Sequence, residues 1–380
     1  MQDGYWGLIN VSTEIMTNQE LQSRAIDVMR FPLAVMVVAI HTYFCEALKA
    51  RGNVDVPFTG VWAHEFITFF SIVLTDAAVP TFFVISGYLY FVKTNTQSIE
   101  CYDWGGYLKK TRRKCLTLLI PYFMWNLVAF LIEPSNYAKP VMDILTGFYS
   151  INGHGPWDGP LWFMRDLFLM MLFAPLFELG IKKIKMALPI ILWIIYVGNF
   201  LGDSIVPGLS YVGLAFFSLG AYSGIWQKGF INSLRNNKIK IIGLYLLMLL
   251  ARIITMHQWG DMSIFTTTVA SLVDMLYIAS TIPAWFVIAS YIGEHTQCID
   301  IWRWLASSGF VIYAMHRLFN SKVSALGLYL IDKPELSGRE AVILYFITIS
   351  ITVLVCIATY WTLGNFKLSS ILFLGARSKH

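Results

Sequence analysis

Long apolar stretches recur along the chain, and short polar segments separate them. Each stretch is close to the length that an α-helix needs to cross the hydrocarbon core of a bilayer. The ten windows lie near residues 26–46, 66–92, 114–132, 160–178, 187–202, 207–226, 240–257, 270–292, 304–328 and 341–363. The pattern predicts an all-α integral membrane protein with about ten transmembrane helices. The pair between 187 and 226 is short and interrupted by glycine and proline, which leaves the count open by one.

The basic residues alternate between the two sides that this topology creates. With the N-terminus inside, 19 of the 28 Lys and Arg residues fall on inner segments, six fall on outer loops and three fall within spans. Short cytoplasmic loops of membrane proteins carry such an excess of basic residues. The N- and C-termini are therefore both predicted to be cytoplasmic.

Composition agrees with this class. Hydrophobic residues make up 57% of the chain and charged residues 13%, whereas soluble domains average about 25% charged residues. We expect one transmembrane domain over 24–363, between a cytoplasmic N-terminal segment, 1–23, and a cytoplasmic tail, 364–380. The five cysteines are scattered without metal-ligand spacing, so no disulfide framework and no metal site is predicted. The sequence contains no nucleic-acid motif. The membrane topology accounts for the net charge of +5, so no polyanionic partner is expected.

The first span carries charges that a lipid-facing helix does not usually carry. Arg30 and His41 are eleven residues apart and return to nearly the same helix face, with Asp27 about one turn away. Ionisable residues at membrane depth usually face a cavity or a partner, so this stripe is a candidate site. The alternative is a snorkelling arginine at the helix end and one satisfied core histidine.

Other spans place polar groups at a similar depth. Counting about 1.5 Å per residue puts His41, Arg165, Asp166, Arg252 and His316 near the middle of the membrane. A central polar cavity accounts for all of them. A structural ion pair is the alternative for Arg165 and Asp166, a carbonyl-bonded core histidine is the alternative for His316, and a structural role is preferred for Arg252.

Two features mark the cytoplasmic half. Ser86 and Gly87 lie about 10 Å inside the inner face, where they either permit close helix packing or leave room for an elongated ligand. Arg112, Arg113 and Lys114 belong to a basic run at the inner end of the third span. Such a run can bind phosphates, for example those of a nucleotide. A basic segment that only fixes the cytoplasmic side of the helix, or a site for anionic lipids, would explain the run equally well.

Five motifs occur in a particular order. They are Arg30, ten residues and His41; FFVISGYL; basic residues before TLLIPYFMWN; PLWFMRDLF; and GFVIYAMH. Together they resemble the membrane-bound acyltransferase 3 family over most of the chain. The resemblance implies an enzyme of the bacterial inner membrane that moves an acyl group, most often acetyl, from cytoplasmic acyl-CoA to a hydroxyl of a sugar or glycolipid. Acetyl-CoA or another acyl-CoA is then a cosubstrate, and no bound cofactor is expected.

The resemblance also implies roles for residues. His41 takes the position of the family's essential histidine and Arg30 that of its paired arginine. Arg112 and Arg113 fall at the basic segment before the third span, where the spacing is looser than in many relatives. Together with Lys114, Ser86 and Gly87, these two arginines are the candidates for binding the donor.

A neutral histidine in a low-dielectric site can act as a base. We expect His41 to take the proton from the acceptor hydroxyl, with Asp166 orienting its ring and Arg165 or the indole NH of Trp162 stabilising the oxyanion. A covalent acyl-histidine is the alternative route. Trp162 and His316 are also candidates for substrate binding.

Two other function classes fit parts of the pattern. Buried His, Arg and Asp in ten spans would also suit a transporter or flippase for a polar solute or lipid-linked sugar. No inverted repeat is evident, and an anionic cytoplasmic cosubstrate explains the basic run better. A sensing or scaffolding relative that has lost catalysis is the third possibility, and the intact pairing of Arg30 with His41 argues against it.

Overall fold

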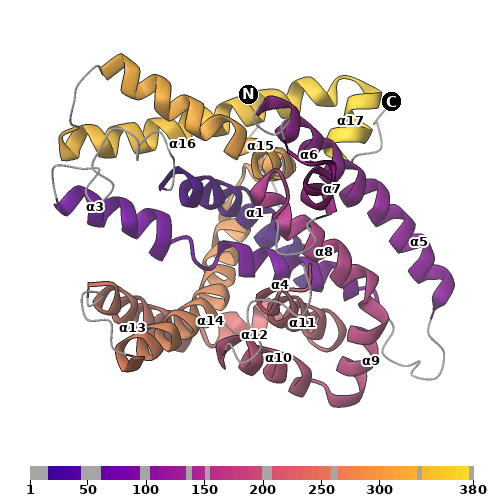
Figure 1. The fold of residues 1–380 in the computed structure, drawn as a ribbon. Coiled ribbons are helices and arrows are strands. Elements are labelled where there is room, and N and C mark those ends of the chain that lie inside the picture. Colours follow the sequence, from indigo (N-terminus) through magenta and orange to yellow (C-terminus); the bar gives the residue numbers. More distant parts are fainter. Residues whose placement is uncertain are drawn as a thin grey trace, which may run out of the picture.

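A computed structural model describes residues 16–43, 61–94, 103–133, 139–149, 155–198, 208–257, 264–331 and 336–375. Of these described residues, 88% are helical and none lies in a strand. The helices pack side by side around a single long helix near the N-terminus (Figure 1). The predicted all-α class is therefore correct.

The central helix is α1, Asn18–Tyr43. Thr17 precedes it and accepts a hydrogen bond from the backbone NH of Glu20 at 3.3 Å, as an N-cap does. Around α1 pack α4 (Ala78–Phe91), α12 (Phe230–Asn236), α14 (Ile264–His295), α15 (Ile299–Ile331) and α16 (Gly338–Gly364). Because α1 contacts five helices, a side chain on almost any of its faces is directed at another element.

Small residues bring neighbouring helices close to one another. A Cβ added at Gly87 of α4 would overlap the carbonyl oxygen of Phe217 in α11 (Tyr211–Trp226), and one at Gly220 would overlap the carbonyl oxygen of Val84. Glycine therefore allows the two backbones to touch. A Cβ added at Gly309 of α15 would meet the Ala34 side chain of α1 at 3.7 Å, an ordinary contact, so this glycine is not required for the packing of α15 on α1.

Two of the predicted spans are interrupted. The second consists of α3 (Val61–Thr68), a π-helical turn η1 (Phe69–Val73), and α4 after a short turn that holds Asp76. The third consists of α5 (Trp104–Lys114), a π-helical turn η2 (Cys115–Leu119), and α6 (Ile120–Ile132). Pro121 has no backbone NH to donate, which accounts for the irregular turn directly before it.

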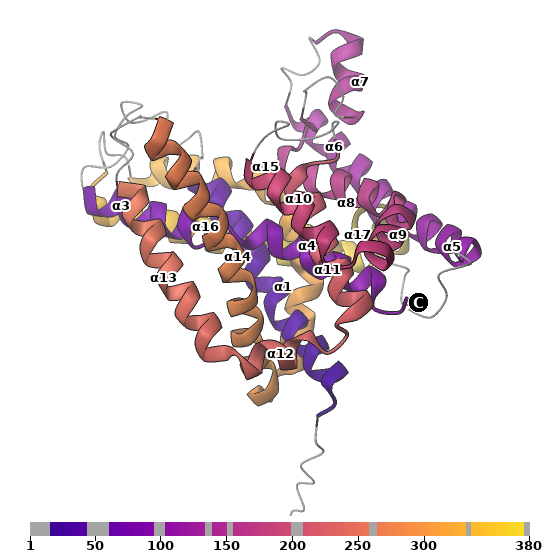
Figure 2. The same ribbon diagram turned by 90° about the horizontal axis from the view of Figure 1, so that it is seen from below.

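The remaining elements cover the sides and ends of the bundle. They are α7 (Val141–Tyr149), η4 (Gly159–Leu161), α8 (Trp162–Leu172), α9 (Ala174–Ile184), α10 (Ala187–Gly198), α13 (Lys238–His257) and α17 (Lys367–Leu374). In Figure 2, α12 and the start of α1 lie at one end of the molecule and α7 at the opposite end.

Five helical stretches are long and apolar enough to cross a membrane within the described part of the chain: Asn18–Thr42, Trp62–Phe91, Trp104–Ile132, Thr268–His295 and Gly338–Gly364. The helices α10 and α11 are apolar but shorter. The predicted fourth span is divided at Phe173 between α8 and α9. The total of ten spans and the side on which each terminus lies stay predictions.

Arg252 lies in a buried ion cluster away from the central helix. Its guanidinium contacts the carboxylate of Asp76 at 3.2 Å and that of Asp274, and its side chain is only 4% exposed. The three residues join α13, α14 and the turn before α4. This arrangement matches the structural role expected for Arg252, because an ion pair with close partners offsets the cost of burying the charge.

Candidate active site

Two histidines meet where α1 packs on α15. The ring centroids of His41 and His316 are 4.9 Å apart, with the ring planes tilted by 44°. His316 is fully buried, and its Nδ1 lies 3.0 Å from the carbonyl oxygen of Ile312 and 2.9 Å from that of Tyr313. Since carbonyl oxygens only accept hydrogen bonds, Nδ1 carries the proton and Nε2 presents a free lone pair.

That lone pair has no hydrogen-bond partner within the described part of the protein. The alternative considered for His316, a core histidine bonded to a backbone carbonyl, thus holds for its Nδ1. Its Nε2 stays available to a ligand. A buried acceptor without a partner costs free energy, so it is a candidate for contact with a ligand.

A buried hydrogen-bond network fixes the position of His41. The side-chain amide of Asn320 donates to Thr42 Oγ1 at 3.0 Å, and Thr352 Oγ1 donates to Asn320 Oδ1 at 2.9 Å. These residues join α1, α15 and α16 directly beside His41. The network holds the C-terminal end of α1 against α15 and thereby sets the spacing of the two histidines.

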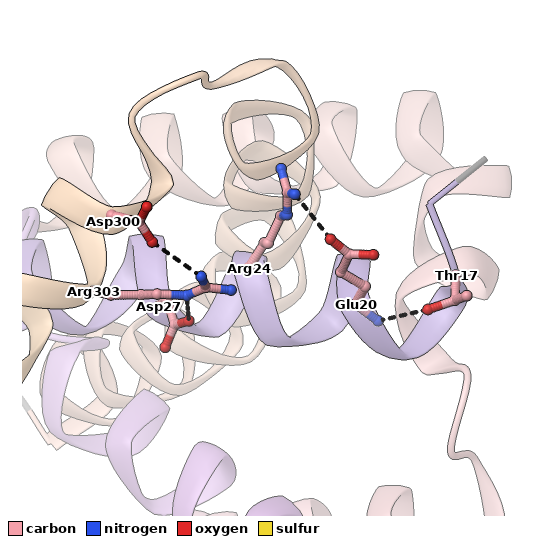
Figure 3. Close-up of polar contacts among 6 residues, drawn as sticks. All are labelled: Thr17, Glu20, Arg24, Asp27, Asp300 and Arg303. Atoms are coloured by element: carbon pink, nitrogen blue, oxygen red, sulfur yellow. Dashed lines mark hydrogen bonds and ion pairs between the residues drawn. The ribbon is translucent and has the colours of Figure 1, made fainter. Parts of the chain in front are cut away.

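The N-terminal half of α1 is attached to the same helix. Arg303 of α15 donates to the carboxylate of Asp27 at 3.3 Å and to that of Asp300 at 3.2 Å (Figure 3). Asp27, which the sequence places on the polar stripe, thus acts at the helix end rather than beside His41. Arg30 lies on α1 between the two attachments, and its side chain is exposed.

Arg165 and Asp166 pair with each other on α8. Two guanidinium nitrogens of Arg165 donate to Asp166 Oδ1 at 3.0 and 2.9 Å, and the backbone NH of Ser210 donates to Oδ2 at 3.2 Å. Ser210 in turn caps α11 by accepting from the NH of Gly213. Asp166 is completely buried and connects α8 to the start of α11. This arrangement corresponds to the structural ion pair that was the alternative for Arg165 and Asp166.

Trp162, at the start of α8, packs on Phe83 of α4 with ring centroids 6.2 Å apart. Of the two small residues on α4, Gly87 faces α11, where it permits close packing. Ser86 is half-buried and lies one turn before Tyr90 on a similar face. The Lys110 ammonium lies 5.1 Å from the centroid of the Tyr90 ring, which joins this end of α4 to α5.

The basic run forms the last turn of α5, directly before the π-helical turn η2. Arg112 and Arg113 are exposed, and Lys114 is half-buried. In the segments that the structure describes, no carboxylate lies within 4 Å of these three cations. A cavity of about 170 Å³ lies between η2, α6, α7 and α8. Leu118, one helical turn after Lys114, and Arg165 are among its lining residues.

A third group of polar side chains adjoins the two histidines on the side of α8. Asp158 directly precedes η4, Tyr313 and Arg317 belong to α15, and the Arg317 guanidinium interacts electrostatically with both Asp158 and His41. Asp158 and Tyr313 are buried, whereas Arg317 is exposed. Asp158 lies outside the membrane-spanning helices, and burial raises the pKa of its carboxyl to about 8 against the opposing effect of Arg317.

Comparison with known proteins identifies the family. A family profile described as an acyltransferase domain, that of acyltransferase 3, matches residues 23–361. The chain belongs to the acyltransferase 3 family. No curated protein and no solved structure gives a match. The family assignment confirms the resemblance read from the five motifs and makes the chain a membrane-bound acyltransferase.

Within this acyltransferase, the structure brings together some of the predicted residues and separates others. His41 and His316 are in contact, Arg165 and Asp166 pair with each other, and the basic run lies at the periphery on α5. The sequence did not single out Arg317 as a site residue, although an arginine within an apolar window beside His316 was the available signal. Tyr313 and Asn320 carried no comparable signal, because buried Tyr and Asn are common within helices.

Asp166→Asn should lower the stability of the protein by about 1–3 kcal/mol, because it weakens the buried pair with Arg165 and the cap of α11. Thermal unfolding in detergent measures this change, with Asp143→Asn on the exposed face of α7 as the control. We expect acyltransferase activity per folded molecule to stay near that of the wild type. A variant that is as stable as the wild type but inactive would show that Asp166 acts in the chemistry itself.

Proposed function

We propose that this protein is an O-acyltransferase of the bacterial cytoplasmic membrane, which transfers an acyl group, acetyl in our proposal, from cytoplasmic acyl-CoA to a hydroxyl of a sugar or glycolipid. The observation that carries the proposal is the contact between His41 and His316 in a chain of the acyltransferase 3 family, with Nε2 of His316 unpartnered among the residues that the structure describes. The sugar acceptor follows from the family resemblance.

In this mechanism His41 is the general base. The acceptor O–H bond breaks as its proton passes to a ring nitrogen of His41, and the oxygen attacks the carbonyl carbon of the thioester. The resulting tetrahedral intermediate collapses with cleavage of the C–S bond, and the histidinium returns the proton to the CoA sulfur. The products are the acyl ester and free CoA, and His41 ends neutral as it began.

His316 supports the reaction through its fixed tautomer. Because Nδ1 donates to backbone carbonyls, Nε2 can only accept a hydrogen bond. A second hydroxyl of the acceptor, or the NH of His41 itself, satisfies this acceptor during the reaction. In either case His316 positions a reacting partner next to His41, and its burial keeps water away from the thioester.

The basic run supplies the donor site in this proposal. Arg112, Arg113 and Lys114 present cations that pair with no carboxylate of the described segments, and the phosphates of acyl-CoA are the anions that we propose bind there. The cavity lined by Leu118 and Arg165 begins one helical turn after this run in the chain and provides space for part of the donor in this proposal. Arg30, exposed on α1 below His41, lies on the cytoplasmic side of the histidine pair.

His41→Ala should abolish transfer of label from radiolabelled acetyl-CoA to a glycan or lipid fraction, because a positioned base contributes about 10²–10⁴-fold to the rate. The assay compares membranes that carry the wild type, His41→Ala and His295→Ala at matched levels. His295 lies at the end of α14 with 74% of its side chain exposed, so its replacement should leave activity unchanged.

The assay also has a result that opposes the proposal. Equal transfer by the wild type and His41→Ala would remove His41 from the chemistry. Absence of transfer with acetyl-CoA and with longer acyl-CoAs would count against an acyl-CoA donor altogether.

The double substitution Arg112→Gln and Arg113→Gln should raise the KM for acyl-CoA by about tenfold or more, because charge-assisted contacts to phosphate contribute about 1.5–3 kcal/mol each. The KM for the acceptor should not change. Steady-state kinetics at two salt concentrations measures both, with Lys240→Gln on the exposed start of α13 as the control for loss of cytoplasmic charge. If the KM for acyl-CoA matches that of Lys240→Gln, the run is a membrane anchor instead.

A further inference from the structure

Three arginines lie within the predicted spans, and two of them are paired with carboxylates. Arg165 donates to Asp166, and Arg252 contacts two carboxylates. The third is Arg317 of α15, and no carboxylate of the described segments lies within 4 Å of its guanidinium. A charged side chain at membrane depth is costly and usually has a partner or a function. Arg317 is therefore the arginine whose presence the packing does not explain.

Arg317 lies next to the histidine pair. It directly follows His316, whose ring contacts that of His41. The guanidinium of Arg317 interacts electrostatically with both histidines. Arg317 is exposed and His41 is half-buried, so a substrate can reach both side chains without entering the buried part of α15. A cation and the proposed base are thus accessible at the same place.

Gly159 leaves the space that the Arg317 guanidinium occupies. A Cβ added at residue 159 would overlap Nη1 of Arg317, so the guanidinium lies directly on the backbone of η4. This backbone is itself held in place, because the NH of Asp158 donates to the side-chain oxygen of Asn126 at 3.2 Å. The segment therefore gives the long arginine side chain a defined position, as a preorganised hydrogen-bond donor requires.

The charge of Arg317 is not compensated by the carboxyl of Asp158 near neutral pH. Burial raises the pKa of this carboxyl to about 8, against the opposing effect of Arg317. The carboxyl of Asp158 consequently keeps its proton near neutral pH and carries no charge. Since a guanidinium stays protonated in proteins, Arg317 presents a full positive charge beside His41.

A cation with several N–H donors beside a general base has a defined use in acyl transfer. When the acceptor oxygen bonds to the carbonyl carbon of the thioester, the π electrons of the C=O bond move onto the carbonyl oxygen, which becomes negative. Donors already aimed at that oxygen stabilise the transition state. Arg165, which the sequence suggested for this role, directs two guanidinium nitrogens at Asp166 instead.

We propose that Arg317 is a catalytic residue that donates hydrogen bonds to the oxyanion formed on the thioester carbonyl oxygen next to His41. This inference rests on the proposed function. His41 takes the acceptor proton as the new C–O bond forms, and two N–H groups of Arg317 donate to the oxyanion. The oxyanion returns its electron pair to the carbonyl as the C–S bond breaks, and the proton on His41 passes to the CoA sulfur.

Arg317→Gln should lower kcat by about 10²–10³-fold, because it removes the charged donor from the oxyanion. The assay follows transfer of label from radiolabelled acetyl-CoA to the glycan and lipid fractions of membranes that carry the full-length protein. The KM for acetyl-CoA should stay within about twofold of the wild-type value, since the lost contact forms only in the transition state. Arg339→Gln, at an exposed position of α16, is the matched control and should leave both constants unchanged.

Chemical rescue separates a catalytic arginine from a structural one. Membranes with Arg317→Ala are assayed in millimolar guanidinium chloride and in sodium chloride at equal ionic strength. Because residue 317 is exposed, guanidinium can reach the vacated position and should restore part of the lost kcat, whereas sodium should not. Arg317→Lys should give a kcat between those of the wild type and Arg317→Gln, since lysine keeps the charge but lacks the planar fork of donors.

Gly159→Ala displaces the guanidinium of Arg317 and leaves every charge of the protein in place. Its kcat should fall by about tenfold to 10²-fold, because a small displacement of a catalytic group has an effect of this size. Gly155→Ala is the matched control. A Cβ at residue 155 meets nothing within 4 Å, so kcat should stay at the wild-type value.

Three results would overturn the assignment. An unchanged kcat in Arg317→Gln would remove Arg317 from the reaction. A raised KM for acetyl-CoA with an unchanged kcat would make Arg317 a residue that binds the donor in its ground state. A lower kcat that guanidinium does not restore would make its role structural.

Failure of this role and failure of the proposed function give different results. If the chain is an acyltransferase with another oxyanion donor, transfer of label depends on His41 and Arg317→Gln matches the wild type. If the chain transfers no acyl group from acyl-CoA, the wild type itself gives no labelled product with acetyl-CoA or with longer acyl-CoAs.

Discussion

A polar group buried among apolar helices must find a partner within the protein, because the surrounding hydrocarbon offers none. Most buried polar groups in this acyltransferase meet that requirement. Asn320 joins Thr42 and Thr352, Arg252 joins two carboxylates, and Asp166 joins Arg165 to the cap of α11. Several buried polar atoms have no hydrogen-bond partner in the part of the chain that the structure describes, and Nε2 of His316 is one of them. The ring of His316 contacts that of His41, which is why we place the chemistry there.

The spacing of the two histidines depends on how α1 is held along α15. Asp27 of α1 is attached to Arg303 near the N-terminal end of α15, and Thr42 near the C-terminal end of α1 is attached to Asn320. A proton acceptor is effective only when it stays within hydrogen-bond distance of the reacting hydroxyl. In our proposal the two attachments fix the register of α1 along α15 and thereby position His41 for the reaction.

The all-α class could be predicted from the sequence, because long apolar stretches reflect the membrane directly, whereas the orientation derived from Lys and Arg stays a prediction. The motif order also identified the family, and the stripe on the first span led to His41. Side-chain partners were harder to predict. Asp166 and Arg165 lie at the same depth as His41, yet which helix faces which cannot be obtained from depth. The break between α8 and α9 at Phe173 and the pairing of Asp27 with Arg303 depend on tertiary contacts that no local pattern encodes. Gly87 was left open between packing and ligand space, and its contact with the α11 backbone supports packing.

The most direct test of the histidine pair is a double-mutant cycle on kcat, measured for His41→Ala, His316→Ala and the double variant in reconstituted membranes. Residues that act as one catalytic unit have strongly non-additive effects. Our account predicts that the double variant is no slower than His41→Ala alone, since His316 acts only through the partner that it positions for His41. Independent effects that multiply in the double variant would contradict the account, because the two histidines would then serve separate steps.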